Sequence, residues 1–144
     1  MPFRCFVLAL LVGGAVAHAA SGQATQDQLG RLLLELNAVE DVGGACRMTF
    51  VARNESGHAI DQAVFETVIF DTSGGVVSLS LFDFRDLPAD RPRVRQFDLP
   101  GLRCDTIGQA LINGANTCLV DGAESDLCDG ALTVGSRLSV ELLG

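Results

Sequence analysis

The chain is 144 residues long and carries 18 acidic against 10 basic residues, which gives a formal net charge of −8 at pH 7. This length fits one domain built around a single hydrophobic core. The acidity argues against binding to nucleic acid or to anionic lipid surfaces, because both need a basic face on the protein.

Residues 1–19 have the three-part layout of a cleavable export signal. Arg4 supplies the positive charge, an apolar run extends from Cys5 to Val16, and Ala17-His18-Ala19 forms a small-x-small cleavage site. The apolar run is about half the ~20 residues that a membrane-spanning helix needs, so we expect cleavage near Ala19 and no stable membrane insertion. The sequence thus predicts a protein of the periplasm, or one that is secreted.

Residues 20–28 are small and polar, and they predict a flexible leader. The folded domain is therefore expected to occupy residues 29–144. Its first apolar segment, 32–36, fits either a strand or a short helix, and we favour the strand. The glycine-containing segment 40–44 is expected to form the turn that follows.

Apolar and polar residues alternate over 46–53, which predicts a strand with one buried face. That face carries Cys46, Met48, Phe50 and Ala52. The remaining predicted strands are 63–70, 76–84, 93–99, 106–113, 131–134 and 137–142. Turns are expected at 54–57 and 71–75, and loops at 87–92 and 113–130. About seven short strands with turns between them predict an all-β fold, a single antiparallel β-sandwich.

The cysteine count indicates disulfide bonds. Of the 5 cysteines, Cys5 leaves with the export signal, and those that remain are Cys46, Cys104, Cys118 and Cys128. An even number in an exported chain is typical of disulfides, whereas a metal site would need closer cysteine pairs with histidines nearby. Several pairings are possible, and we favour Cys46 with Cys104 and Cys118 with Cys128.

A basic cluster interrupts the otherwise acidic chain. Arg91, Arg93 and Arg95 alternate, so on a strand they would share one face, and that face could clamp carboxylates or phosphates of a partner. The alternative interpretation is local ion pairing, because Asp residues interleave with the arginines at positions 83, 86, 90 and 98. We take the three arginines as the candidate binding residues.

No pattern in the sequence predicts a catalytic residue, a metal site or a cofactor. His58 lies in a predicted turn, and no nucleophile motif surrounds it. A glycine-containing acidic loop carries Asp121, Glu124, Asp126 and Asp129, whose oxygens are of the kind that calcium prefers. Their spacing departs from that of a calcium-binding loop, so a solvated acidic loop is the expected state.

The stretch from Val51 to Leu99 resembles the FxLYD-like immunoglobulin-type domains of bacterial exported proteins. The resemblance rests on Asn54-x-Ser56-Gly57, the strand from Val64 to Phe70 closing on Asp71, Gly75 with Val76-Val77, and the Leu87-Pro88-Ala89 loop. Phe82-Asp83-Phe84 only loosely matches the aromatic signature of these domains, and the cysteine-bearing C-terminal part lies outside the stretch. The resemblance implies an immunoglobulin-like β-sandwich. The whole mature sequence is also similar to a group of small exported proteins of alphaproteobacteria, which brings no known activity to carry over.

The sequence therefore predicts a non-enzymatic periplasmic module that binds another protein or a component of the cell envelope. Binding is expected at an exposed sheet edge or at the face formed by Arg91, Arg93 and Arg95. Two alternatives stay open: a small calcium-binding module that uses the loop 121–129, and a hydrolase or enzyme accessory subunit whose site the sequence does not reveal.

Overall fold

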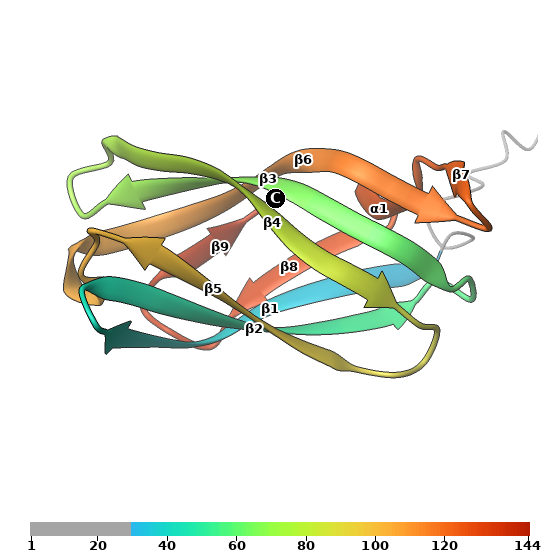
Figure 1. Ribbon diagram of the computed structural model, residues 1–144, viewed down its shortest axis with the longest axis horizontal. Coiled ribbons are helices and arrows are strands. Elements are labelled where there is room, and N and C mark those ends of the chain that lie inside the picture. The colour runs from blue at the N-terminus through green and yellow to red at the C-terminus, as the bar shows by residue number, and fades with distance from the viewer. Residues whose placement is uncertain (1–29) are drawn as a thin grey trace, which may run out of the picture.

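Two stacked β-sheets make up the computed structural model, which describes residues 30–144 (Figure 1). The predicted export signal (1–19) and leader (20–28) lie outside the described residues. Within residues 30–144, no helix has the length and apolar character needed to cross a membrane. The fold is an all-β sandwich with short helical turns.

The first sheet has the strand order β5-β2-β1-β8. Its strands are β1 (Arg31–Val42), β2 (Ala45–Glu55), β5 (Arg93–Pro100) and β8 (Leu132–Ser136). The second sheet has the order β4-β3-β6-β7, and β9 pairs with β6. Its strands are β3 (Ile60–Asp71), β4 (Val76–Leu87), β6 (Ile107–Val120), β7 (Ala123–Glu124) and β9 (Glu141–Leu143). The helical turns are η1 (Cys104–Thr106) and α1 (Leu127–Gly130).

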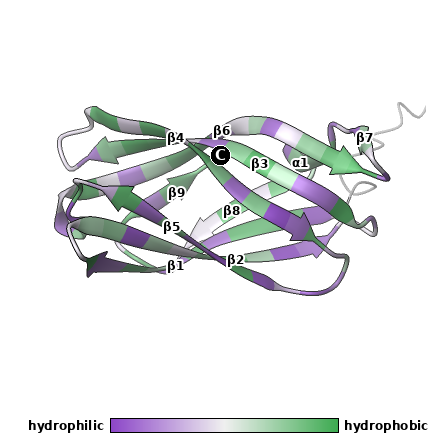
Figure 2. Ribbon diagram, viewed as in Figure 1, coloured by the Kyte–Doolittle hydropathy of each residue, from purple (hydrophilic) through white to green (hydrophobic). Residues whose placement is uncertain are grey.

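The core forms where the inner faces of the two sheets meet. The predicted inward residues of β2, namely Cys46, Met48, Phe50 and Ala52, are all buried, which confirms the period-two pattern. Figure 2 shows hydrophobic and hydrophilic residues alternating along the strands. This alternation is how one sequence supplies both a core face and an outer face.

Phenylalanines from both sheets fill one side of this core. Phe50 of β2 packs edge-on against Phe84 of β4, with ring centroids 5.5 Å apart. Phe82 of β4 stacks on Phe97 of β5 at 4.1 Å. Aromatic pairs of this geometry contribute about 0.5–1.5 kcal/mol each beyond the area that they bury. The cluster joins β4 to β5, which are edge strands of different sheets.

Two disulfides cross-link the sandwich, and they have the pairing that the sequence analysis favours. Cys46 in β2 is bonded to Cys104 in η1, across a sequence separation of 58 residues. Cys118 in β6 is bonded to Cys128 in α1, across 10 residues. The first bridge thus anchors the connection between the sheets, and the second holds α1 against β6.

The predicted antiparallel pairing holds for most pairs of strands, but two pairs are parallel. β8 pairs with β1 in parallel, with Leu32 beside Leu132, and β9 pairs with β6 in parallel, with Ala110 beside Leu142. The predicted strand 137–142 is reduced to β9, because residues 137–140 carry the chain from the first sheet to the second. The hydroxyl of Ser136 accepts a hydrogen bond from the Leu138 amide and donates one to the Val140 carbonyl, which fixes this passage.

The predicted loop 113–130 is also wrong over its first part, since β6 continues to Val120. The segment is rich in small polar residues with low β-propensity, and it becomes a strand by pairing with β3 through register shifts. Likewise, β1 extends to Val42, so the expected turn at 40–44 is confined to Gly43 and Gly44. Both glycines have positive φ, at 53° and 82°, which few other residues adopt.

Asn54 ties the turn after β2 to the end of β4. Its side-chain amide donates hydrogen bonds of 2.7 Å to the carbonyl oxygens of His58 and Leu87. Its side-chain oxygen accepts from the Ser56 amide (3.1 Å) and the Ser56 hydroxyl (2.6 Å). The residue is buried, so every polar atom of its side chain is satisfied inside the protein. This network explains the Asn54-x-Ser56 pattern seen in the sequence.

Candidate interaction surface

The candidate arginines lie on the flank where β4 and β5, the edge strands of the two sheets, run past each other (Figure 1). Arg93 and Arg95 are on β5, and both pair with Asp86 of β4, at 3.0 Å and 3.2 Å. Arg91 precedes β5 in the loop and lines a separate hollow with Asp90. The expected three-arginine face is therefore divided, and two of its members are engaged with the chain itself.

Arg95 occupies backbone hydrogen-bond acceptors in the second half of β4. Its Nε donates to the carbonyl oxygen of Phe84 at 2.6 Å, and its Nη2 donates to the carbonyl oxygen of Asp86 at 3.1 Å. The side chain is only 17% exposed. Arg85 adopts a positive φ of 58° beside a register shift in the pairing with β3, so the strand is also bulged here. A bulge and capped carbonyl groups are devices that block strand addition.

Asp86 binds Arg93 and Arg95 through its ionised carboxylate, and these three side chains form the Asp86 clamp. The hydrogen bond that Arg93 donates lowers the pKa of Asp86 below its ordinary value, and the positive charge of Arg95 adds to the effect. Because the folded-state pKa is depressed, the clamp stabilises the fold above the unfolded-state pKa of about 4. Its contribution is lost as the pH falls through the lower folded-state pKa.

We expect Asp86→Asn to lower the midpoint of urea unfolding at neutral pH. The midpoint of this variant should also change less than that of the wild type as the pH is lowered. The gap between wild-type and variant midpoints should be full above about pH 5 and close progressively below pH 4. Urea titrations across this range measure it. Glu124→Gln is the control, since Glu124 makes no ion pair among residues 30–144. A gap independent of pH would contradict the ion-pair role of Asp86.

The first half of β4 is open and charge-free. From Val76 to Phe82 the strand contains only apolar residues and serines. Leu79 and Leu81 lie on its outer face, and Leu79 is 60% exposed. Val77 is also exposed, at a register shift in the pairing with β3. Ser78 and Ser80 occupy the other face, with their hydroxyl groups 3.3 Å apart. Figure 2 shows this contrast along β4, hydrophobic at its start and hydrophilic at its end.

Sequence reasoning predicted this strand but missed its exposed apolar face. The alternation identifies two faces, and the usual inference is that the apolar face is the buried one. In β4 the aliphatic residues lie on the exposed face instead. Phe82 and Phe84 are buried, and they place the even-numbered residues from Ser78 onward on the core side of the strand. The sequence signal that could have revealed this is that Phe82 and Phe84 lie two and four residues after Ser80, on the same face of the strand as the serines.

A shallow hollow of about 480 Å³ lies between the two edge strands beside this segment. Its lining residues are Leu81, Asp83, Arg85, Val94, Arg95, Gln96 and Phe97. Val94 is 59% exposed, so β5 adds an apolar side chain close to those of β4. The other edge strands, β7, β8 and β9, are shorter than β4. Among the edge strands of residues 30–144, β4 therefore has the longest uncharged segment.

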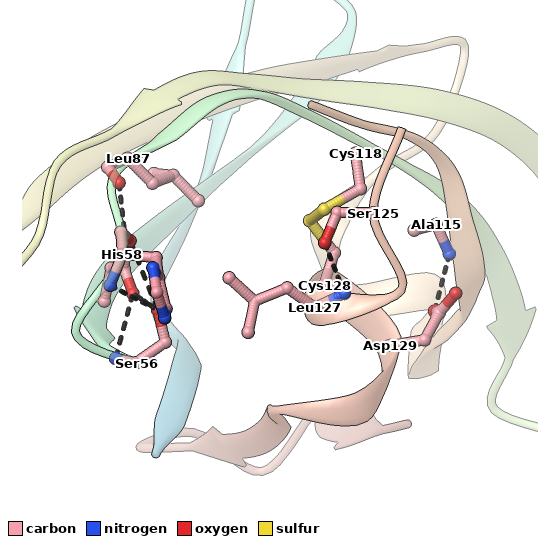
Figure 3. Close-up of a disulfide and its surroundings, with 10 residues drawn as sticks. Ser56, His58, Leu87, Ala115, Cys118, Ser125, Leu127, Cys128 and Asp129 are labelled. Carbon is pink, nitrogen blue, oxygen red and sulfur yellow. Dashed lines mark hydrogen bonds between the residues drawn. A yellow bond between two sulfur atoms is a disulfide. The ribbon is translucent and has the colours of Figure 1, made fainter. Parts of the chain in front are cut away.

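A second hollow, of about 440 Å³, lies between the His58 turn and α1, next to the Cys118–Cys128 bridge (Figure 3). Leu127 points into it, and Ser125 lines it. Within residues 30–144 the His58 imidazole makes no hydrogen bond, and the Ser125 hydroxyl accepts one from the Leu127 amide.

The acidic loop does not form a cluster of ligands. Asp129 accepts a hydrogen bond from the Ala115 amide at 2.8 Å, and so helps to hold α1 against β6 (Figure 3). Asp121, Glu124 and Asp126 lie along the connection between β6 and α1. Among residues 30–144, no three potential metal-ligating side chains lie close enough together to hold an ion.

No protein-family model matches the chain, and no curated protein or solved structure is significantly similar to it.

Proposed function

We propose that this chain is a non-enzymatic binding module that works outside the cytoplasm and holds a partner protein along the open half of β4. An extended segment of the partner adds to the second sheet as a further strand. Backbone hydrogen bonds along β4 supply affinity, and side-chain contacts with Val77, Leu79 and Leu81 supply selectivity. The observation that carries the proposal is this uncharged edge with exposed aliphatic residues.

The contrast within β4 supports this interpretation. Natural edge strands are normally protected by charges, prolines, bulges or a covering segment. The second half of β4 has a bulge, carries charged residues and is capped by Arg95. Val76–Phe82 has a register shift at Val77, but it contains no charged residue and no proline. A strand that carries charges over one half and none over the other is the pattern expected when the uncharged half is used for binding.

The proposed fold family is the immunoglobulin-like sandwich. The neighbours β1-β2-β5 in one sheet and β4-β3-β6 in the other follow the order in which such domains divide their strands between sheets. The disulfides differ, because Cys46 of β2 bonds to Cys104 rather than to β6. Domains of this type commonly serve in binding outside the cytoplasm, and the export signal predicted at residues 1–19 fits that location.

Site-specific photocrosslinking tests the proposed function. A photoreactive phenylalanine analogue replaces Leu79 in the full chain, expressed with its own signal in a bacterial host, and Leu143 of β9 is the control position. Irradiation should yield covalent adducts with protein at position 79 and none above background at position 143. Arg in place of Val77 and Leu81 should abolish the adducts. Equal adduct yields at positions 79 and 143 would overturn the proposal.

A further inference from the structure

We infer that the partner segment held along the open half of β4 is basic, with a lysine or arginine near each end and aliphatic residues between them. This inference rests on the proposed function and names the chemistry of the occupant of the same edge. It follows from the distribution of charge between the two sheets, from the carboxylates beside the open half, and from the length of strand that separates them.

The second sheet carries an excess of negative charge. The strands of the first sheet hold equal numbers of basic and acidic residues, namely Arg31, Arg47, Arg53, Arg93 and Arg95 against Glu35, Glu40, Asp41, Glu55 and Asp98. The strands of the second sheet hold one basic residue, Arg85, against Asp61, Glu66, Asp71, Asp83, Asp86, Glu124 and Glu141. Of these carboxylates, only that of Asp86 forms an ion pair within residues 30–144. A partner with positive charge complements such a surface.

Three of these carboxylates surround the open half of β4. Asp71 lies at its start, where its Oδ1 accepts a hydrogen bond of 2.9 Å from the Gly75 amide. Glu66 of β3 pairs in register with Leu81. Asp83 follows directly after the open half and is exposed. No basic residue lies between Asp71 and Asp83 in the sequence, so a cation on the partner would meet a carboxylate at either end of the open half.

Hydrogen bonds keep the first of these end carboxylates ionised. The Ser73 hydroxyl donates to Asp71 Oδ1 at 2.7 Å, and together with the bond from the Gly75 amide it lowers the pKa of Asp71 below its ordinary value. At the other end, the Arg85 amide donates to Asp83 Oδ1 at 2.8 Å. Within residues 30–144 no salt bridge joins the side chains of Asp83 and Arg85. Both end carboxylates are therefore open to a cation from outside the chain.

The separation of the two end carboxylates sets the length of the partner segment. Asp83 follows Gly75, the neighbour of Asp71, by eight residues, which span about 27 Å at ~3.4 Å per residue. An extended segment of similar length therefore places one cationic side chain beside each carboxylate. Between them, Leu79 and Leu81 are 60% and 54% exposed and offer contacts to aliphatic side chains. These contacts do not require an unbroken ladder, which the register shift at Val77 interrupts.

Neutralising the two end carboxylates tests this inference in the photocrosslinking assay at position 79. Asp71→Asn combined with Asp83→Asn removes both charges and keeps an oxygen that can accept the hydrogen bonds of each side chain. The adduct yield should fall, because two exposed ion pairs change an affinity by roughly two- to thirty-fold. Asp121→Asn combined with Glu124→Gln is the matched control. It changes the net charge equally, beside β7 and away from β4, and it should leave the yield unchanged.

Synthetic peptides with blocked termini test the charge directly on the purified mature chain. The probes share an alternating run of valine and threonine and differ only in their two end residues, which are lysine, glutamine or glutamate. Fluorescence anisotropy should give the tightest binding for the lysine peptide and the weakest for the glutamate peptide. Added salt should weaken the lysine peptide, because it screens exposed charges. The preference for lysine should disappear in Asp71→Asn with Asp83→Asn, and circular dichroism checks that this variant remains folded.

Equal affinities for the lysine and glutamine peptides would overturn the basic partner, as would no binding of the lysine peptide. An equal loss of adducts in the Asp121→Asn, Glu124→Gln control would overturn the assignment of the charges to the ends of the open half. The proposed function fails by a different result, the absence of specific adducts at position 79. Adducts that persist in full after Asp71 and Asp83 are neutralised would thus reject a basic partner and leave the binding edge in place.

Discussion

Replacing Cys46 and Cys104 together by Ala is expected to lower the free energy of unfolding by about 4 kcal/mol. The bridge closes a segment of 58 residues, so it removes much conformational freedom from the unfolded chain. Cys46 is also fully buried in the core, and the shorter alanine leaves a small void there. Because domains are commonly stable by only about 5–15 kcal/mol, this loss consumes a large part of the total.

The Cys118–Cys128 bridge provides the matched comparison. It closes only 10 residues, and its removal by the double Ala substitution is expected to cost about 3 kcal/mol. Urea unfolding of both double variants at neutral pH, followed by circular dichroism, gives the two values. A larger loss from the shorter loop would contradict the chain-entropy argument and would assign the greater role to the packing of α1 against β6.

Asn54→Ala is expected to lower the free energy of unfolding by about 3 kcal/mol, although it removes only a small side chain. The substitution takes away both donors to the carbonyl oxygens of His58 and Leu87, and it also takes away the acceptor used by Ser56. Buried polar groups left without partners cost about 1–3 kcal/mol each. The turn after β2 would then detach from the end of β4.

Two further variants separate this network from a general effect of losing an asparagine. Asn54→Asp keeps the acceptor but replaces the donors by a negative charge facing two carbonyl groups, so it should destabilise at least as much at pH 7. Asn113→Ala, where the amide bonds to Glu66 on the surface, should stay within about 0.5 kcal/mol of wild type. Equal losses for Asn54→Ala and Asn113→Ala in urea unfolding would contradict the role of Asn54.

Local patterns predicted the parts of this fold that depend on one buried face. In β2 the alternation from Cys46 to Ala52 is complete, and the structure buries the expected residues. In β6 the small polar residues beyond Asn113 carry no such pattern, and their strand state depends on pairing with β3. The parallel neighbours of β1 and β6 come from the far end of the chain, and no short-range signal encodes such contacts.

The candidate surface could also be predicted only in part, because it depends on contacts between segments that are distant in the sequence. The interleaved aspartates correctly indicated that ion pairing could engage the arginines, and Asp86 is the residue that does so. The capping of β4 carbonyls by Arg95 could not be foreseen, because it requires β4 and β5 to be edges of different sheets on one flank. The exposure of Leu79 depends on which face of β4 meets the core, which is a property of the tertiary structure.

The parallel pairing of β1 with β8 also sets the order in which the chain can fold. Leu32 finds its neighbour Leu132 only when nearly the whole polypeptide is available, so the first sheet stays incomplete during synthesis. Contacts between such distant segments slow folding, because a long loop must close before they form. A chain that completes its first sheet late stays unfolded for longer, and this would suit the export proposed from residues 1–19.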